Sequence, residues 1–392
     1  PGGGIAADRR ARHDLGMLSL FDDYPVHQTP DPIAVPASSD RDVYERYWFN
    51  GYSSDASTYL GVATAYYPHL GIKDCGISFV IDGVQHAFHA SARATDEPTD
   101  LQIGPFRLEI VEPMRSCRLT LDDNETGWKA DLLFQGRTAN IEEPRHTWMH
   151  GLRRVMDTTR FTQLGHWTGS LTYGEETIHF TGTDMPGTKD RSWGLRPLVG
   201  GDPRGAPPLP RETGLFFLWA PLHFDDLGVH YQLFEDTKGR PLYTVGAFLP
   251  VYDSIADLPG VEDPGATHMR NLEHRVTFSD TSRMIETAQL AFTSIDDGTR
   301  HEIEFEKQFT YRMKGIGYSH PEWGHGQWKG EVAVGAEQWS LDSVDDTSFE
   351  NQHVQHLMKV RMGERTGVGV LEQNILGPYR PYGLTGAIRP PG

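Results

Sequence analysis

Short runs of alternating apolar and polar residues recur along the chain, and polar turns separate them. One pair of runs, ISFVI and VQHAFHA, flanks Asp82 and Gly83. An Asp-Gly step between alternating runs is among the strongest signals of a β-hairpin, because both residues tolerate the positive φ of a tight turn. The runs RLTL and WKADLLF, and then WTGSLTY and TIHFTG, repeat the arrangement. The first half of the chain is therefore predicted to form antiparallel strand pairs.

The second half shows the same pattern. VHYQLF and PLYTVGAFL flank the turn EDTKGR, and LAFTSI and HEIEFEKQFTYRM flank DDGTR. A parallel βαβ fold would need helical runs of about 10–15 residues between strands, and the sequence offers none. The pattern predicts an all-β protein made of antiparallel barrels or sandwiches.

A segment rich in proline and glycine, PLVGGDPRGAPPLPRET, divides the chain at residues 197–213. Such a composition sustains neither a strand nor a helix, so this segment is predicted to be a linker. The expected organisation has four parts: an N-terminal extension (1–40), a first domain (41–196), the linker (197–213) and a second domain (214–388). A loop at 254–271 is expected to be either a lid or an insertion.

Charge and composition narrow the functional classes. The chain has 36 basic and 54 acidic residues, a net charge of −18, which argues against a nucleic-acid partner. No apolar stretch approaches the roughly 18 residues of a membrane-spanning helix. Two cysteines, Cys75 and Cys117, do not make a disulfide framework. The start of the chain lacks the apolar core of a signal peptide, so a reducing, cytoplasmic location is expected.

The segment GTKDRSWG, residues 187–194, places a carboxylate, a guanidinium and an indole side by side. In a strand, Asp190 and Ser192 would share one face, and Arg191 and Trp193 would share the other. An aspartate inside an apolar barrel has a raised pKa and can act as a general acid. The alternative is a surface strand end at which Asp190 pairs with Arg191 or Arg196.

A second cluster, GYSHPEWGHGQWKGE at 317–331, gathers aromatic and imidazole side chains. Histidine can move a proton near pH 7, and aromatic faces stabilise a developing cation. The residues singled out here are Tyr318, His320, Trp323 and His325. The alternative is an aromatic-rich strand pair that contains ordinary hydrogen-bonded histidines.

A third segment, GVGVLEQNILGPYRPYGL, carries Glu372 within an otherwise apolar run. This carboxylate either faces outward or is buried with a partner, for which His320 and His325 are candidates. No metal site is expected, because the histidine pairs at 146/150 and 353/356 lack a cysteine pattern or an HExxH motif.

Several of these segments resemble a known family. TQLGHWTGSLTYGEETIHFTGTDMPGTKDRSWG resembles the end of the first domain in the carotenoid 1,2-hydratase / hydroxyneurosporene synthase-like proteins. GYSHPEWGHGQWKGE and LEQNILGPYRPYGL resemble the second domain of an uncharacterised bacterial branch of that superfamily. The resemblance implies two tandem lipocalin-like (calycin) barrels with a hydrophobic channel near their junction.

The same resemblance assigns a role to Asp190, which matches the family aspartate thought to protonate an isoprenoid double bond. Arg191 replaces the usual histidine, and Ser192 replaces the usual asparagine. A neighbouring cation lowers the pKa of an aspartate, which opposes this role unless Arg191 points to the opposite face.

The predicted function is a lyase or isomerase, hydratase-like or cyclase-like, that uses acid catalysis on a hydrophobic isoprenoid-type or polycyclic substrate without metal or redox cofactor. Asp190 would be the acid, and His320 or His325 would orient water or take a proton. The expected cavity residues are Trp193, Tyr318, Trp323, Arg191 and Glu372. One alternative is a non-catalytic carrier of a hydrophobic ligand, in which Asp190 and Arg191 form a structural pair. Another is a hydrolase of a polar substrate, which predicts a wet and charged cavity.

Overall fold

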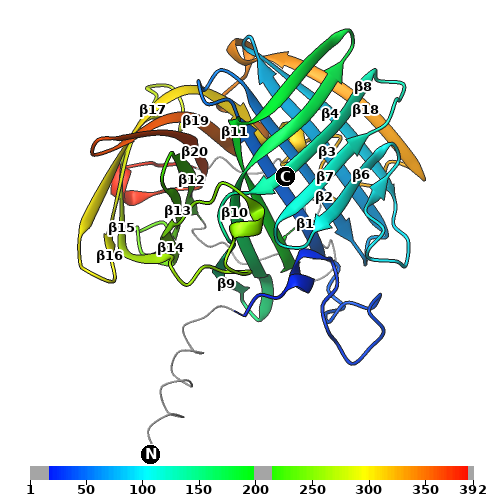
Figure 1. Ribbon diagram of the computed structural model, residues 1–392, viewed down its shortest axis with the longest axis horizontal. Helices are drawn as coiled ribbons and strands as arrows, with labels where there is room; N and C mark the ends of the chain where they lie inside the picture. Colours follow the sequence, from blue (N-terminus) through cyan, green and yellow to red (C-terminus); the bar gives the residue numbers. More distant parts are fainter. Residues whose placement is uncertain (1–16, 198–213, 387–392) are drawn as a thin grey trace, which may run out of the picture.

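The computed structural model describes residues 17–197 and 214–386 and shows two β-units side by side (Figure 1). The predicted all-β fold with tandem barrels is therefore confirmed. All but the first residue of the predicted linker lies outside the described residues. The helices of the described parts are short 3₁₀ turns: η1 (Leu20–Asp23), η2 (Ile255–Asp257), η3 (Met313–Ile316), η4 (Leu341–Ser343), η5 (Phe349–Asn351) and η6 (Arg380–Tyr382). None of them is long and apolar enough to cross a membrane.

The first unit is a twelve-stranded antiparallel sheet that curls until β5 lies near β3 and β4. Its strands are β1 (Val43–Tyr52), β2 (Tyr59–Tyr67), β3 (Ile72–Ile81), β4 (Val84–Arg93), β5 (Gln102–Ile103), β6 (Phe106–Glu112), β7 (Ser116–Leu121), β8 (Trp128–Gly136), β9 (Ile141–His150), β10 (Arg153–Tyr173), β11 (Glu176–Leu195) and β18 (Val332–Ser340). They follow the order β18-β4-β3-β2-β1-β11-β10-β8-β7-β6-β5, and β9 pairs with β10.

The second unit is a closed eight-stranded barrel. Its strands, in barrel order, are β12 (Leu215–Phe224), β13 (Gly228–Glu235), β14 (Pro241–Leu249), β15 (Thr267–Phe278), β16 (Ile285–Ser294), β17 (Arg300–Arg312), β19 (Val354–Met362) and β20 (Arg365–Leu376). Closure leaves this barrel without an open edge.

The hairpins predicted from alternation and turn residues are present. Asp82 (φ 50°) and Gly83 (φ 74°) both have positive φ, as a two-residue hairpin turn requires, and they join β3 to β4. The other predicted pairs, β7 with β8, β10 with β11, β13 with β14 and β16 with β17, are antiparallel neighbours.

One strand crosses between the units. β18 follows β17 in the chain but pairs antiparallel with β4 of the first sheet, from Val332 opposite Ala92 to Ser340 opposite Val84. Figure 1 shows it as an orange strand at the edge of the blue and cyan sheet. The first sheet is therefore completed by a segment from the second half of the chain.

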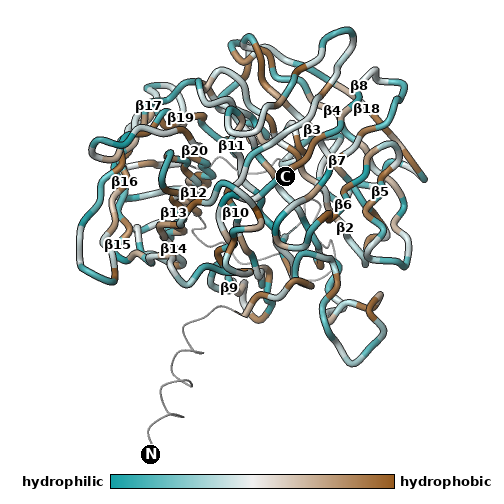
Figure 2. The backbone as a smooth tube through the Cα atoms, in the orientation of Figure 1, coloured by the Kyte–Doolittle hydropathy of each residue, from teal (hydrophilic) through white to brown (hydrophobic). Residues whose placement is uncertain are grey.

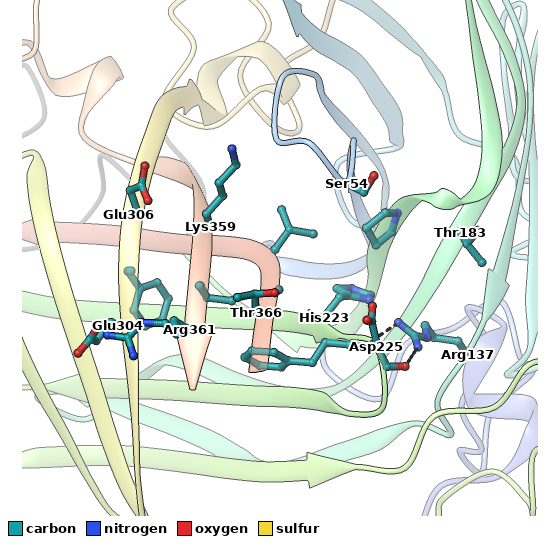
Figure 3. A pocket seen from close by; sticks show the side chains of 16 residues that line it. Ser54, Arg137, Thr183, His223, Asp225, Glu304, Glu306, Lys359, Arg361 and Thr366 are labelled. Atoms are coloured by element: carbon teal, nitrogen blue, oxygen red, sulfur yellow. Dashed lines mark hydrogen bonds and ion pairs between the residues drawn. The ribbon is translucent and has the colours of Figure 1, made fainter. Parts of the chain in front are cut away.

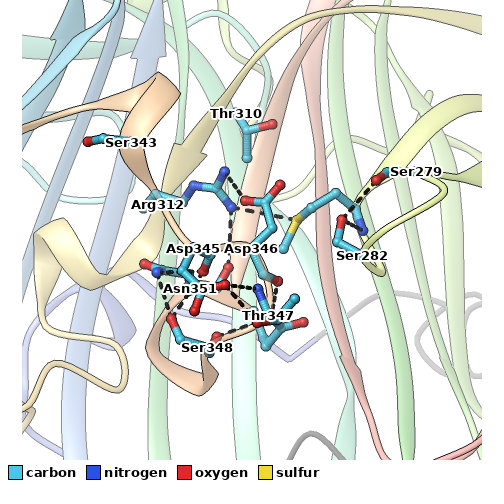
Figure 4. A network of polar contacts seen from close by, with 12 residues as sticks. Ser279, Ser282, Thr310, Arg312, Ser343, Asp345, Asp346, Thr347, Ser348 and Asn351 are labelled. Atoms are coloured by element: carbon cyan, nitrogen blue, oxygen red, sulfur yellow. Dashed lines mark hydrogen bonds and ion pairs between the residues drawn. The ribbon is translucent and has the colours of Figure 1, made fainter.

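The return from β18 to β19 is held by a polar network around Arg312 (Figure 4). The buried guanidinium of Arg312 donates to Asp346 Oδ1 at 2.6 Å and to the Asn351 carbonyl at 3.3 Å. Asn351 in turn donates to the Asp345 carbonyl at 2.9 Å. These bonds fix both ends of the excursion that carries β18 to the first sheet.

The three largest apolar clusters of the described residues fill the two units and join them, and Figure 2 shows hydrophobic positions along the strands of both units. One cluster fills the first unit, with Phe49 and Trp167 among its members, and a second fills the barrel. The third joins the outer faces of the two units and contains Trp48 and Trp219. Side chains alternate along a strand, so Phe49 points into the first unit while Trp48 points toward the barrel.

The loop predicted as a lid or an insertion is tied to the first unit. Arg115 donates to the carbonyls of Ile255 at 2.7 Å and Leu258 at 3.3 Å. Asn140 forms a parallel bridge with Glu262. These contacts make the loop a brace between the units, and its last residues already belong to β15.

Candidate functional site

A cavity of about 120 Å³ lies between the two units, where their outer faces meet. Asp190, Tyr318 and Glu372, three of the residues singled out in the sequence, line it together. Its other polar and aromatic residues are Tyr44, Arg46, Trp48, Thr158, Arg160, Ser192, Arg196, Phe217, Trp219, Phe234, His353 and Asn374. The site thus belongs to neither barrel interior, which corrects the expectation of an acid inside a barrel.

Strand register explains why these side chains converge. In the first sheet Trp48 lies opposite Asp190 and Arg46 lies opposite Ser192, so all four share the outward face. In the barrel, Trp219 of β12 lies opposite Glu372 of β20. The pleat directs the side chains of all these positions toward the junction.

Asp190 is buried, and its partner is Arg160 of the neighbouring strand β10. Arg160 Nε lies 3.2 Å from Asp190 Oδ2. Burial raises the pKa of Asp190 to about 6, and the Arg160 guanidinium only partly offsets this effect. The alternative of a surface pair with Arg191 or Arg196 is wrong, because Asp190 is buried and its ion-pair partner is Arg160.

A second buried carboxylate, Glu143, stands behind Arg160. It accepts hydrogen bonds from Thr162 at 3.0 Å and from Tyr243 at 2.9 Å. His230 Nε2 lies 3.3 Å and Arg160 Nη1 lies 3.5 Å from its oxygens. Burial acts to raise the pKa of Glu143, but Arg160 and His230 hold it well below its usual range. Arg160 is therefore shared by one firmly ionised carboxylate and one that titrates near neutrality.

Glu372 faces the cavity with His353 as its partner. His353 Nε2 lies 2.6 Å from Glu372 Oε1, and Gln355 donates to Oε2 at 2.5 Å. The expected partners His320 and His325 are wrong, because the register of β19 and β20 places Gln355, not the 317–331 segment, opposite Glu372. The outward-facing alternative is wrong too, since Glu372 is buried.

Tyr318 lies between two guanidiniums at the rim of the cavity. Arg46 stacks 4.5 Å from the centre of its ring, and Arg196 Nη1 donates to its hydroxyl at 3.4 Å. Burial acts to raise the pKa of this phenol, but the two cations outweigh burial and lower it. The His353 ring packs edge-on against Tyr318, with 4.3 Å between ring centres.

Comparison with known sequences assigns the family. One family model, described only as a family of unknown function, DUF8625, matches residues 18–385. The chain belongs to the DUF8625 family. No curated protein matches the sequence. The resemblance to carotenoid hydratases accordingly stays a prediction.

Solved structures with a similar fold share little sequence with this DUF8625 protein. A putative AttH from Nitrosomonas europaea has a TM-score of 0.49 and 11% identity, and the match covers 87% of this chain and 98% of that one. CghA has a TM-score of 0.48 and 9% identity, with 91% and 97% covered. CghA with Sch210972 has a TM-score of 0.47 and 10% identity, with the same coverage.

Arg191 and Trp193 lie on the opposite face of β11, as strand alternation predicts. Arg191 Nη2 donates to Glu45 Oε2 at 2.5 Å. Trp193 stacks on His27 with 4.5 Å between ring centres and lines a different cavity, of about 500 Å³, under the N-terminal segment. Neither residue lines the junction cavity, so their proposed contact with its substrate finds no support in the geometry.

The 317–331 segment of the DUF8625 chain is a series of turns, so the strand-pair alternative is wrong. His325 supports the junction cavity indirectly, since its Nε2 donates to the Ile316 carbonyl at 2.9 Å and its Nδ1 lies 3.0 Å from Arg46 Nη1. His320 and Trp323 lie away from the cavity, against β4, where Trp323 stacks on His89.

His89, His320 and Glu337 have the side-chain types of a metal site, and their candidate ligand atoms lie within 4.8 Å of one another. The hydrogen bonds favour a different role. Nδ1 of His320 accepts from the backbone N–H groups of Glu322 at 3.0 Å and Trp323 at 2.8 Å, which places the ring proton on Nε2. That proton points to Glu337, 2.7 Å away, where a metal would need a lone pair. The cluster fits a clamp that holds β18 on β4.

A larger cavity, of about 600 Å³, opens between β11 and the barrel (Figure 3). Charged side chains such as Glu304, Lys359 and Arg361 line it, as Figure 3 shows. His223 also lines this cavity, and burial holds its pKa well below the usual value. The junction cavity is the stronger candidate because its carboxylates are buried, whereas those of the larger cavity, Asp225, Glu304 and Glu306, are exposed.

Sequence reasoning missed Arg160, Glu143 and Arg46, and it considered His353 only as half of a possible metal-binding pair. Arg46 and Arg160 stand at alternate positions among residues that are uncharged, along β1 and over the 156–164 part of β10, which is the signal that could have found them. Their pairing with Asp190 depends on strand register between distant segments, which no local pattern encodes.

Proposed function

We propose that the junction cavity is the active site of a cofactor-independent lyase or isomerase in which Asp190 is the general acid. The observation that carries the proposal is a buried carboxylic acid with a pKa of about 6 in the wall of an aromatic-lined cavity. A general acid works best when its pKa is near the operating pH. At pH 7 about a tenth of the protein molecules carry a protonated Asp190, which can donate its proton. In the remaining molecules Asp190 is ionised and can accept a proton.

The aromatic part of the wall suits a substrate that becomes positively charged on protonation. The rings of Trp48, Phe217 and Trp219 line the cavity, and aromatic faces stabilise a nearby cation. His353, oriented by Glu372 at 2.6 Å, is placed to accept a proton or to position water. His353 takes over the role that the sequence suggested for His320 or His325.

Cavity size limits the part of the substrate that reacts. A cavity of 120 Å³ is somewhat smaller than an engineered cavity of about 150 Å³ that holds benzene. Only one ring, or one isoprenoid end of a larger hydrophobic substrate, fits beside Asp190. The remainder of the substrate would extend toward solvent.

The alternative is a non-catalytic carrier, and one observation favours it. Asp190, Arg160 and Glu143 form a connected buried ion-pair network that also makes sense as a structural tie at the junction. In that case the cavity would hold its ligand without changing it.

Native mass spectrometry of the chain expressed in cells separates the two functions and requires no assumption about the substrate. We expect Asp190→Asn to retain an unreacted small molecule that differs from anything bound to the wild type, in mass for a lyase and in chromatographic retention after release for an isomerase, whose substrate and product have the same mass. Asp131→Asn is the matched control, because Asp131 is an exposed residue paired with Arg118. The same molecule, by mass and by retention, on wild type and Asp190→Asn would support the carrier and overturn the acid.

A further inference from the structure

Three side chains that line the junction cavity carry buried hydrogen-bond donors that have no partner. Among the described residues, nothing accepts from the indole N–H of Trp48, the indole N–H of Trp219, or Nε and Nη2 of Arg46. These three side chains are only 4%, 2% and 2% exposed. Buried donors are nearly always paired in folded proteins, so three such side chains in one cavity wall indicate a ligand that accepts.

Arg46 is also a buried cation without a carboxylate at ion-pair distance among the described residues. Its Nη1 faces His325 Nδ1 at 3.0 Å, and its guanidinium stacks on Tyr318. Asp74 and Asp190 act on it only through longer-range attraction. A buried guanidinium is costly unless a counter-charge accompanies it.

The carboxylates of the cavity wall are already engaged. Asp190 is paired with Arg160, and Glu372 accepts from His353 and Gln355. The wall therefore offers spare donors and few spare acceptors.

The unpaired edge of the Arg46 guanidinium is the same edge with which other arginines of this protein bind carboxylates. Arg93, Arg118 and Arg145 each hold a carboxylate side-on through Nε and Nη2, at 2.6–2.8 Å. Nε and Nη2 are the two atoms left unpaired on Arg46. This fork geometry matches the two oxygens of a carboxylate.

We infer that Arg46, with the indole N–H groups of Trp48 and Trp219, forms an oxyanion subsite that binds the carboxylate of a substrate whose cavity-bound part is one ring in size. The inference rests on the proposed function and deepens it, since it names the chemistry of the group anchored beside Asp190. The substrate is then a hydrophobic acid, and its charged end is fixed while Asp190 faces the carbon skeleton.

Binding of benzoate and of its neutral isostere benzamide to the full chain tests the subsite, with tryptophan fluorescence or calorimetry as the readout. We expect benzoate to bind at least tenfold more tightly than benzamide. Arg46→Gln should remove this preference and leave benzamide affinity unchanged. Arg118→Gln, which alters an exposed arginine of the same bidentate type, is the matched control and should change neither affinity.

A second variant covers the case in which Arg46→Gln fails to fold. Trp48→Phe combined with Trp219→Phe removes the two N–H donors together with part of each ring, so the readout is the ratio of benzoate to benzamide affinity, which we expect to fall about threefold to tenfold. Equal affinity for the two probes, no benzoate binding at millimolar concentration, or an unchanged preference in the folded variants would overturn the subsite. Asp190→Asn should keep the benzoate preference, so loss of the acid hypothesis and loss of the subsite give different results.

Discussion

The chemistry of Asp190 depends on which face of one strand it occupies. The segment GTKDRSWG predicts the separation of Asp190 from Arg191, and the structure has it, with Arg191 bound to Glu45 on the far side. The segment does not predict Arg160 as the partner, because Arg160 is brought in by the register of β10 against β11. The alternation of side chains along a strand can be predicted from a short segment, whereas the counter-ion of a buried carboxylate depends on segments that are distant in the sequence.

The pKa of Asp190 predicts how its replacement affects stability. Its folded-state pKa, about 6, is above the unfolded value of about 3.9, so the folded state binds the extra proton between these limits. The stability this group contributes is complete below about pH 4 and is lost as the pH rises through about 6. Asp190→Asn should therefore equal the wild type at pH 4 and exceed it by up to about 3 kcal/mol at pH 7.5, at about 1.4 kcal/mol per pKa unit.

Urea denaturation of both proteins at the two pH values measures this difference. Asp131→Asn should show the opposite sign at pH 7.5, because hydrogen bonds from Arg118 lower the pKa of that exposed carboxylate. A wild type that is more stable than Asp190→Asn at pH 7.5 would contradict the assignment of burial as the dominant cause.

At the scale of elements, the sequence predicts strands and hairpins well and strand partners poorly. The Asp82–Gly83 turn fixes β3 against β4 because the connection leaves no other choice. No short turn joins β18 to its partner, because β4 lies more than 200 residues earlier in the chain. The segment before it, 317–331, reads as a catalytic cluster in the sequence, but much of it serves to carry and clamp β18.

The clamp on β18 can be weakened at one residue. Glu337 accepts from His89 at 3.0 Å and from His320 at 2.7 Å, and these bonds lower its pKa although partial burial acts to raise it. Its contribution to stability is therefore present above the unfolded pKa of about 4.3 and is lost only at acidic pH. Glu337→Gln should speed amide hydrogen exchange in β18 about fivefold to tenfold at pH 7, as expected for a weakened charge-assisted pair.

Hydrogen exchange followed by mass spectrometry resolves β18 from its neighbours. Glu331→Gln is the control, since Glu331 pairs with the exposed Arg93 just before the strand. If both variants exchange alike, the histidine clamp does not hold the strand.

At the scale of the whole molecule, the two units depend on each other. The third apolar cluster, with Trp48 on one side and Trp219 on the other, is buried only when the units meet. The same contact creates the junction cavity, so the site exists only in the assembled molecule. Composition and alternation predict two barrels, but which outer faces meet is decided by packing of side chains from distant strands.

Separating the halves should therefore destroy the first one. A fragment of residues 17–197 lacks β18, which leaves the edge of β4 open, and it exposes the outward aromatic residues of β1 and β2. Open edges and large apolar patches both promote aggregation. We expect this fragment to aggregate when expressed alone and to be recovered in a folded complex when residues 214–386 are expressed with it. Solubility, size-exclusion chromatography and near-ultraviolet circular dichroism measure the outcome. A monomeric fragment 17–197 with ordered aromatic signals would contradict this prediction and would support independent domains that end at 196 and begin at 214.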